Sequence, residues 1–235
     1  MSDVRVVEDP AAEAAELIAD AVRAGGHVAL AGGSTPRAAY RLLAEMDLDW
    51  SGATLWFGDD RCVPPDDELS NYRMAKEALL DAVAGDGGPE VKRIPAERGP
   101  SVAADDYERE LRETLGEELP RLDLILLGLG PDVHTASLFP GQDSLNAKDR
   151  LVVGVEEAGL EPLVPRVTFT LPLINAARSV VFLVAGEDKS DAAARAFGDR
   201  EAGPDAPASL VRPVPGELVV LLDEGAASRL PSAAR

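Results

Sequence analysis

The segment from Leu122 to Gly141 reads LDLILLGLGPDVHTASLFPG, and the rest of the chain can be interpreted from it. Its first six residues are apolar except for one aspartate, which is the pattern of a buried strand. Two glycines and a proline then end that strand sharply. In an open α/β sheet, ligands bind where the carboxyl end of a strand turns toward a helix. The segment therefore predicts a central strand with a ligand site at its end, and Thr135 or Ser137 could cap a short helix beyond it.

One of the two histidines of the chain, His134, follows this strand, two residues after Asp132. A carboxylate so close in sequence can fix the tautomer of an imidazole or shift its pKa, as general base catalysis requires. The alternative is a turn in which Asp132 caps a helix and His134 only packs. An isolated Asp-x-His pair is a weak signal, so the residues alone leave both interpretations open.

Strand and helix patterns alternate along the whole chain, which predicts an α/β fold with a mostly parallel sheet and helices on both faces. Neither an internal repeat nor a long polar linker divides it, so residues 1–235 are expected to form a single domain. The tail from Glu224 is expected to be frayed. We expect strands at 27–31, 53–57, 122–127, 151–155, 165–172, 180–185 and 218–222, and helices at 10–24, 37–46, 70–84, 101–118, 173–178 and 186–197.

A glycine-rich turn, Gly32-Gly33-Ser34-Thr35-Pro36, follows the expected strand at 27–31. Glycines allow backbone amides to approach an anion, hydroxyls donate hydrogen bonds, and a helix amino terminus adds positive potential. Pro36 suits the first position of a helix. The alternative is an ordinary helix cap, but two glycines exceed what a cap requires, so the pattern favours phosphate binding at Gly33, Ser34 and Thr35.

Two adjacent acids and an arginine, Asp59-Asp60-Arg61, follow the expected strand at 53–57. They could form a solvated turn, or a general base beside an anion-binding guanidinium. The next residue, Cys62, is the only cysteine, which excludes an internal disulfide and a zinc site built on cysteines. It lies in a proline-rich loop with no histidine nearby in sequence, which argues against a nucleophilic thiol.

The formal net charge of −19 argues against a nucleic-acid partner, because no basic stripe is available to neutralise phosphates. An anionic small molecule would need a local positive site placed against this overall field. No apolar run reaches the roughly 18 residues of a membrane-spanning helix, and the amino terminus lacks the pattern of a signal peptide. We therefore expect no membrane association and a cytoplasmic protein.

Four motifs in order resemble the 6-phosphogluconolactonase family, within the superfamily that includes glucosamine-6-phosphate deaminase. They are AGGSTP at 31–36, WFGDDR at 56–61 with Val63-Pro64 and Ser70-Asn71, the segment at 128–141, and PRVTFTLP at 165–172. The resemblance implies a Rossmann-like fold and hydrolysis of 6-phospho-D-glucono-1,5-lactone in the oxidative pentose phosphate pathway. We expect a monomer or a small homo-oligomer, and the sequence does not decide between them. It also implies that His134 is the general base, that Ser34 and Thr35 hold the phosphate, and that Arg61, Arg166 and Lys189 are further anion contacts.

The chain departs from the family pattern at two positions. Asp60 stands where Glu is usual, and Val133 stands where the family usually has glycine between Asp132 and His134. Because a β-branched residue adopts a positive φ only at a cost, we expect Val133 to take an ordinary backbone conformation.

The chemistry expected from these residues is attack of water on the lactone carbonyl, with His134 as base and Asp132 or Asp59 orienting the reacting groups. Amides of the turn at 128–133, or an arginine, would stabilise the oxyanion. Neither a metal nor another cofactor is implied. One alternative is the deaminase branch, which uses an acid where this chain has Phe139. Another is a non-catalytic sugar-phosphate sensor, since a fold alone does not fix function.

Overall fold

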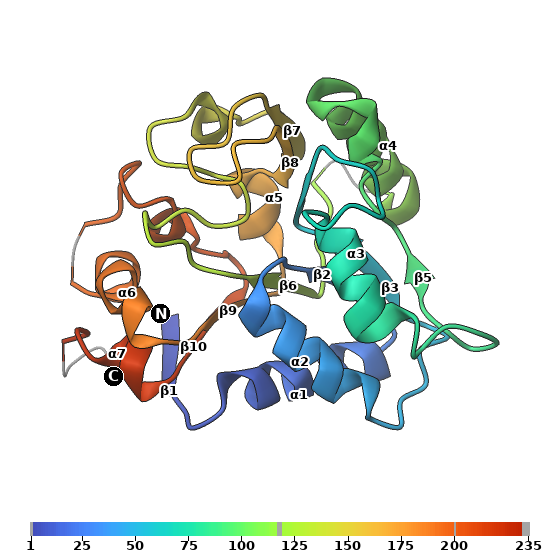
Figure 1. The fold of residues 1–235 in the computed structure, drawn as a ribbon, viewed down its shortest axis with the longest axis horizontal. Coiled ribbons are helices and arrows are strands. Elements are labelled where there is room, and N and C mark those ends of the chain that lie inside the picture. Colours follow the sequence, from blue (N-terminus) through green and yellow to red (C-terminus); the bar gives the residue numbers. More distant parts are fainter. Residues whose placement is uncertain (1, 117–118, 200, 232–235) are drawn as a thin grey trace.

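The computed structural model describes residues 2–116, 119–199 and 201–231. Its centre is an all-parallel sheet in which the strand from the carboxyl-terminal region, β10, lies between β1 and β9. Figure 1 shows this sheet running through the middle of the molecule. In spatial order its strands are β1 (Ser2–Val6), β10 (Glu217–Leu222), β9 (Ser179–Val184), β6 (Leu124–Leu127), β2 (His27–Leu30), β3 (Thr54–Phe57) and β5 (Glu90–Val91).

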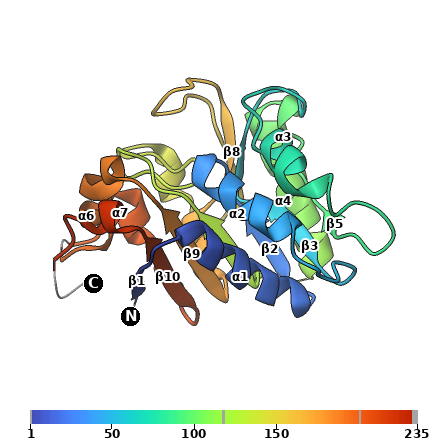
Figure 2. The same ribbon diagram turned by 60° about the horizontal axis from the view of Figure 1, so that its bottom comes forward.

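Helices cover both faces of this sheet, as the alternating pattern predicts. Figure 2 shows α1 and α2 lying together in front of β9 and β2, and both helices contact β9. The apolar face of α1 supplies Ile18 and Val22 to the core, and Asp9 caps its amino terminus. The helices are α1 (Pro10–Arg23), α2 (Ser34–Ala44), α3 (Asn71–Ala75, continued by a π-turn at Lys76–Leu80), α4 (Pro100–Leu115), α5 (Leu171–Ala176), α6 (Ser190–Phe197) and α7 (Glu224–Ala227).

A second, antiparallel sheet was not anticipated from the sequence. It consists of β4 (Asp59–Arg61), β8 (Arg166–Phe169) and β7 (Val152–Val155). The acid–acid–arginine triplet, for which the sequence left open a solvated turn or a catalytic role at the end of a strand, is therefore a strand itself. In the register of β4 and β8, Arg61 lies directly opposite Arg166.

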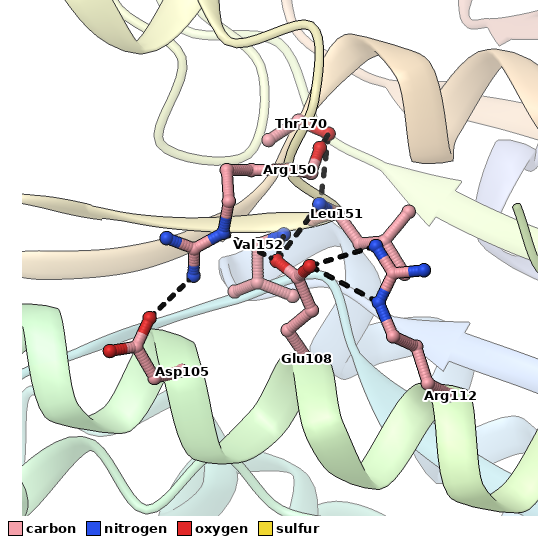
Figure 3. A network of polar contacts seen from close by, with 7 residues as sticks. All are labelled: Asp105, Glu108, Arg112, Arg150, Leu151, Val152 and Thr170. Atoms are coloured by element: carbon pink, nitrogen blue, oxygen red, sulfur yellow. Dashed lines mark hydrogen bonds and ion pairs between the residues drawn. The ribbon is translucent and has the colours of Figure 1, made fainter. Parts of the chain in front are cut away.

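A buried carboxylate attaches the second sheet to α4 (Figure 3). Glu108 accepts hydrogen bonds from the backbone amides of Leu151 and Val152, at 3.0 and 3.3 Å, and from Arg150 Nε at 2.8 Å. Arg112, one turn further along α4, forms an ion pair with the same carboxylate at 2.9 Å. Burial alone would raise the pKa of Glu108, but these donors hold it below its usual value. The network holds β7 against α4, and β7 in turn pairs with β8, the strand that carries Arg166.

Three expectations about helices and the end of the chain are wrong. The helix expected at 37–46 begins at Ser34, so Pro36 stands in its first turn and not at its first position. No helix begins at Thr135 or Ser137; instead, Thr135 and Leu138 form an isolated antiparallel bridge. The described part of the tail expected to fray contains α7, whose first turn is capped by Asp223, whereas residues 232–235 lie outside the described residues. In the described parts of the chain, no helix is long and apolar enough to cross a membrane.

Candidate active site

A cleft of about 250 Å³ opens at the carboxyl ends of β2, β3, β6 and β9, where the α/β rule places ligands. Most residues expected to form the site line it. They are Gly33, Ser34, Thr35, Asp59, Arg61, His134, Arg166 and Lys189. Asp132 is not part of this lining, but it contacts His134 from behind. Asp60 is also absent from the lining.

His134 and Asp132 form a short contact, with 2.5 Å between Nδ1 and Oδ1. The same carboxylate oxygen accepts a hydrogen bond from the His134 backbone amide at 3.2 Å. Burial would raise the pKa of Asp132, but its contacts with His134 hold it below the usual value. Because an ionised carboxylate only accepts, Nδ1 carries the proton and a neutral ring presents its unprotonated Nε2.

The turn before His134 contains a left-handed backbone conformation that the sequence does not predict. Val133 adopts φ 72°, which contradicts the expectation of an ordinary conformation. Its side chain is completely buried in the main core, so packing compensates for the strain of a β-branched residue in the left-handed region. Gly130 lies so close to the His134 ring that an added Cβ would overlap it. The turn is closed by hydrogen bonds from the amide of Val133 to Gly130 O and from the amide of Gly130 to His134 O.

Asp59 is held at the cleft by two residues whose part in the site was not predicted. Ser137 Oγ donates to Asp59 Oδ2 at 2.7 Å, and Asn71 Nδ2 donates to the backbone oxygen of Asp59 at 3.0 Å. The sequence suggests Ser137 as a possible helix cap and places Asn71 in a family motif, but it assigns neither of them a contact with Asp59. Asn71 also packs against Gly32, where any side chain would overlap it. The first glycine of the turn, Gly32, is thus required for close packing against Asn71, and both Gly32 and Gly33 line the cleft.

The neighbouring acid, Asp60, points away into the fold. Its carboxylate accepts hydrogen bonds from the amides of Asn71 and Tyr72, at 2.7 and 3.1 Å, and from Ser70 Oγ at 3.2 Å. Burial raises the pKa of Asp60 to about 6, although these donors act in the opposite direction. Asp60 therefore fixes the start of α3, while Asp59 faces the cleft.

Two arginines give the cleft its positive charge. Arg166 donates from Nε to Val164 O at 3.1 Å and from Nη2 to Pro162 O at 2.7 Å. Arg61 donates from Nη1 to Leu69 O, whereas its buried Nε has no hydrogen-bond partner. Burial, followed by the charge of Arg61, lowers the pKa of Arg166. Among the described residues, neither guanidinium has a carboxylate in ion-pair contact, so the pair is suited to an anion.

The first turn of α2 lines the same cleft as these arginines. Gly33 occupies the N-cap position at φ 110°, and no side chain caps this end of the helix. The first amides of a helix have no partner within it, so those at Ser34 and Thr35 are available to an anion. Lys189 reaches the cleft from the connection between β9 and α6.

Cys62 is half-buried, and its pKa is raised to about 11, mainly by burial. A thiol with such a pKa is neutral near pH 7, which counts against a nucleophile. Within the described ranges, no group of three or more His, Cys, Asp or Glu side chains could hold a metal ion.

The model of the family described as glucosamine-6-phosphate isomerases/6-phosphogluconolactonase matches residues 2–220. The chain belongs to this family. A 6-phosphogluconolactonase of Synechocystis is 44% identical over 216 residues, which cover 89% of this chain and 87% of the relative. The fold matches the crystal structure of 6-phosphogluconolactonase from Leishmania guyanensis with a TM-score of 0.87 and 29% identity, covering 99% of this chain and 100% of the other.

A structure described as a monomeric glucosamine-6-phosphate deaminase also superimposes well, with a TM-score of 0.79 over 97% of this chain and 99% of the other. Its identity is only 20%, so it shares the fold, and no activity follows from it.

Proposed function

We propose that this protein hydrolyses 6-phospho-D-glucono-1,5-lactone to 6-phospho-D-gluconate, a step of the oxidative pentose phosphate pathway. One observation carries the proposal beyond family membership. A carboxylate-oriented histidine faces the same cleft as two arginines, a lysine and an uncapped helix amino terminus. The cleft thus combines a base with a site for a dianionic phosphate.

In the proposed mechanism, His134 Nε2 removes a proton from water as the water attacks the lactone carbonyl. Asp132 holds the ring in the required tautomer and stabilises the imidazolium that forms. The carbonyl oxygen becomes the tetrahedral oxyanion, and His134 then returns the proton to the departing ring oxygen. Asp59, held by Ser137, lies where it can orient the water or a sugar hydroxyl.

The hydrogen bonds of the turn limit which groups can stabilise the oxyanion. The amides of Gly130 and Val133 already bond within the turn, so they are less suitable donors than the sequence suggested. We assign oxyanion stabilisation to one of the two arginines of the cleft. The other arginine, with Ser34, Thr35 and Lys189, would bind the phosphate. These phosphate contacts orient the lactone so that its carbonyl meets His134.

The test is proton release from freshly prepared 6-phosphoglucono-δ-lactone, with unphosphorylated glucono-δ-lactone alongside and spontaneous hydrolysis subtracted. We expect strong acceleration of the phosphorylated lactone and only weak, still measurable acceleration of the unphosphorylated one. Absent acceleration, or equal acceleration of both, would contradict the proposal. Release of ammonia from glucosamine 6-phosphate would point instead to the deaminase branch, in which an acid replaces the buried Phe139 that packs on His134.

The expectations of a cytoplasmic location, of no nucleic-acid partner, and of a monomer or small homo-oligomer stay predictions.

A further inference from the structure

Lys189 lies at the end of the segment 186–189, called here the lysine segment, which is not held in place by its own side chains. Glu187 and Asp188 are exposed, and Lys189 itself is half-buried at the edge of the cleft. The segment begins at Gly186, which has φ 102°, a conformation that side-chain-bearing residues rarely adopt. Its position must therefore be fixed through its backbone.

The anchor is a carboxylate from the far end of the chain. Asp223 Oδ2 accepts a hydrogen bond from the amide of Gly186 at 2.8 Å, and Oδ1 accepts one from the amide of Ala226 at 2.7 Å. One half-buried side chain thus joins the start of the lysine segment to the first turn of α7. Hydrogen bonds from backbone amides to a charged acceptor are among the stronger ones in proteins.

A close approach at Gly225 supports the same connection. A Cβ at this position would lie 3.0 Å from the backbone nitrogen of Glu187, which is tighter than ordinary packing permits. Helix α7 therefore lies directly against the lysine segment, and Figure 1 shows α7 beside α6, which continues from that segment.

We propose that Asp223 is a positioning residue that sets Lys189 for binding the substrate phosphate. This inference rests on the proposed function, because it takes the phosphate as the partner of Lys189. Asp223 does not line the cleft, and acts through the backbone at Gly186. Its loss weakens phosphate binding and leaves the chemistry at His134 unchanged.

The experiment compares Asp223→Ala with the wild type on the phosphorylated and unphosphorylated lactones. We expect KM for the phosphorylated lactone to rise about tenfold, the size of one lost hydrogen bond to a charged group, with kcat unchanged. Turnover of the unphosphorylated lactone should not change. Asp223→Asn keeps one acceptor oxygen for the two amides and should rescue part of the loss.

Asp191→Asn is the matched control, because this exposed aspartate on α6 forms an ion pair with Arg229 at the surface and does not line the cleft. It should match the wild type on both lactones. Gly225→Ala provides a second route if Asp223→Ala folds poorly, because it displaces α7 while keeping the carboxylate; it should raise the same KM by a smaller factor.

A double-mutant cycle with Lys189→Ala tests whether Asp223 acts through Lys189. If Asp223 acts through Lys189, Asp223→Ala should add little to the KM of the Lys189→Ala enzyme. An undiminished effect in that background, or an equal loss on both lactones, overturns the inference while the proposed function stands. A wild type with no preference for the phosphorylated lactone would overturn both.

Discussion

The two sides of the cleft are built in contrasting ways. The histidine side is local: Asp132, His134 and Phe139 belong to one turn whose hydrogen bonds span a few residues. The anion side is assembled from distant segments, because Arg61 and Arg166 come from the small sheet, Ser34 and Thr35 from α2, and Lys189 from beyond β9. A short motif therefore specifies the reacting group, whereas the whole fold is needed to specify which substrate it meets.

The largest effect is expected on the histidine side. His134→Ala should lower kcat by roughly 10²- to 10⁴-fold, because the proton acceptor for the attacking water is lost. The loss should be proportionate on any lactone that the enzyme turns over. Steady-state proton release measures it, and near-wild-type turnover would show that another group is the base.

On the anion side, Arg61→Ala should raise KM for the phosphorylated lactone roughly 10- to 100-fold, because a charge-assisted contact is lost. It should affect the unphosphorylated lactone far less, since that substrate has no phosphate to bind. Arg178→Ala is the control, because this exposed arginine pairs with Asp123 outside the cleft. Equal losses on both lactones would assign Arg61 to the carbonyl end of the substrate.

Two carboxylates next to the cleft residues, Asp132 behind His134 and Asp60 beside Asp59, should change stability with pH in opposite directions. The lowered pKa of Asp132 contributes stability that is present above its unfolded-state pKa and is lost as pH falls through the folded value. Asp60, raised to about 6, favours the folded state while protonated, so its contribution is full below the unfolded pKa and is lost as pH rises through about 6.

Urea unfolding of Asp132→Asn and Asp60→Asn between pH 3 and 7 tests this contrast. As pH rises, the Asp132→Asn variant should become less stable relative to the wild type, because only the wild type gains the contribution of the ionised Asp132. The Asp60→Asn variant should instead become more stable relative to the wild type, by on the order of 2 to 3 kcal/mol between pH 4 and 7. Parallel curves for the two variants would contradict the assigned directions.

The smallest effect concerns the strain at Val133. Val133→Ala and Val133→Gly both remove buried methyl groups, but only glycine relieves the positive φ, which costs roughly 1 kcal/mol or more. The glycine variant should therefore unfold at the same temperature as the alanine variant or higher, the reverse of the usual order. Thermal unfolding by circular dichroism measures the difference, and a clearly less stable glycine variant would show that the turn relaxes without strain.

The sequence predicts the parts of this molecule whose patterns are long or chemically distinctive. The strands around Leu30, Phe57 and Leu127 are confirmed, as are the helices on both faces. In the site, the glycine-rich turn and His134 lie at one cleft, as expected from the rule for parallel sheets.

The remaining errors have physical causes. The sequence does not predict strand β4, because it has three residues, all of them charged, and because its pairing with β8 joins segments far apart in sequence. Propensity rules argue against φ 72° at Val133, and only burial of its side chain in the core overrides them. The positions of Ser137 and Asn71 around Asp59 depend on tertiary contacts that no local pattern encodes.

The pairing of β1 with β10 has a consequence for synthesis of the protein. Ser2 lies opposite Leu218, so β1 leaves the ribosome long before its only neighbour in the sheet exists. Until β10 arrives, β1 is an unpaired strand, and its charged Asp3 and Arg5 discourage other chains from pairing with it. Asp223 follows β10 immediately, so the last part of the sheet to form and the anchor of Lys189 become available together. A nascent chain can thus carry its histidine turn before its anion site, which is complete only after Asp223 has been synthesised.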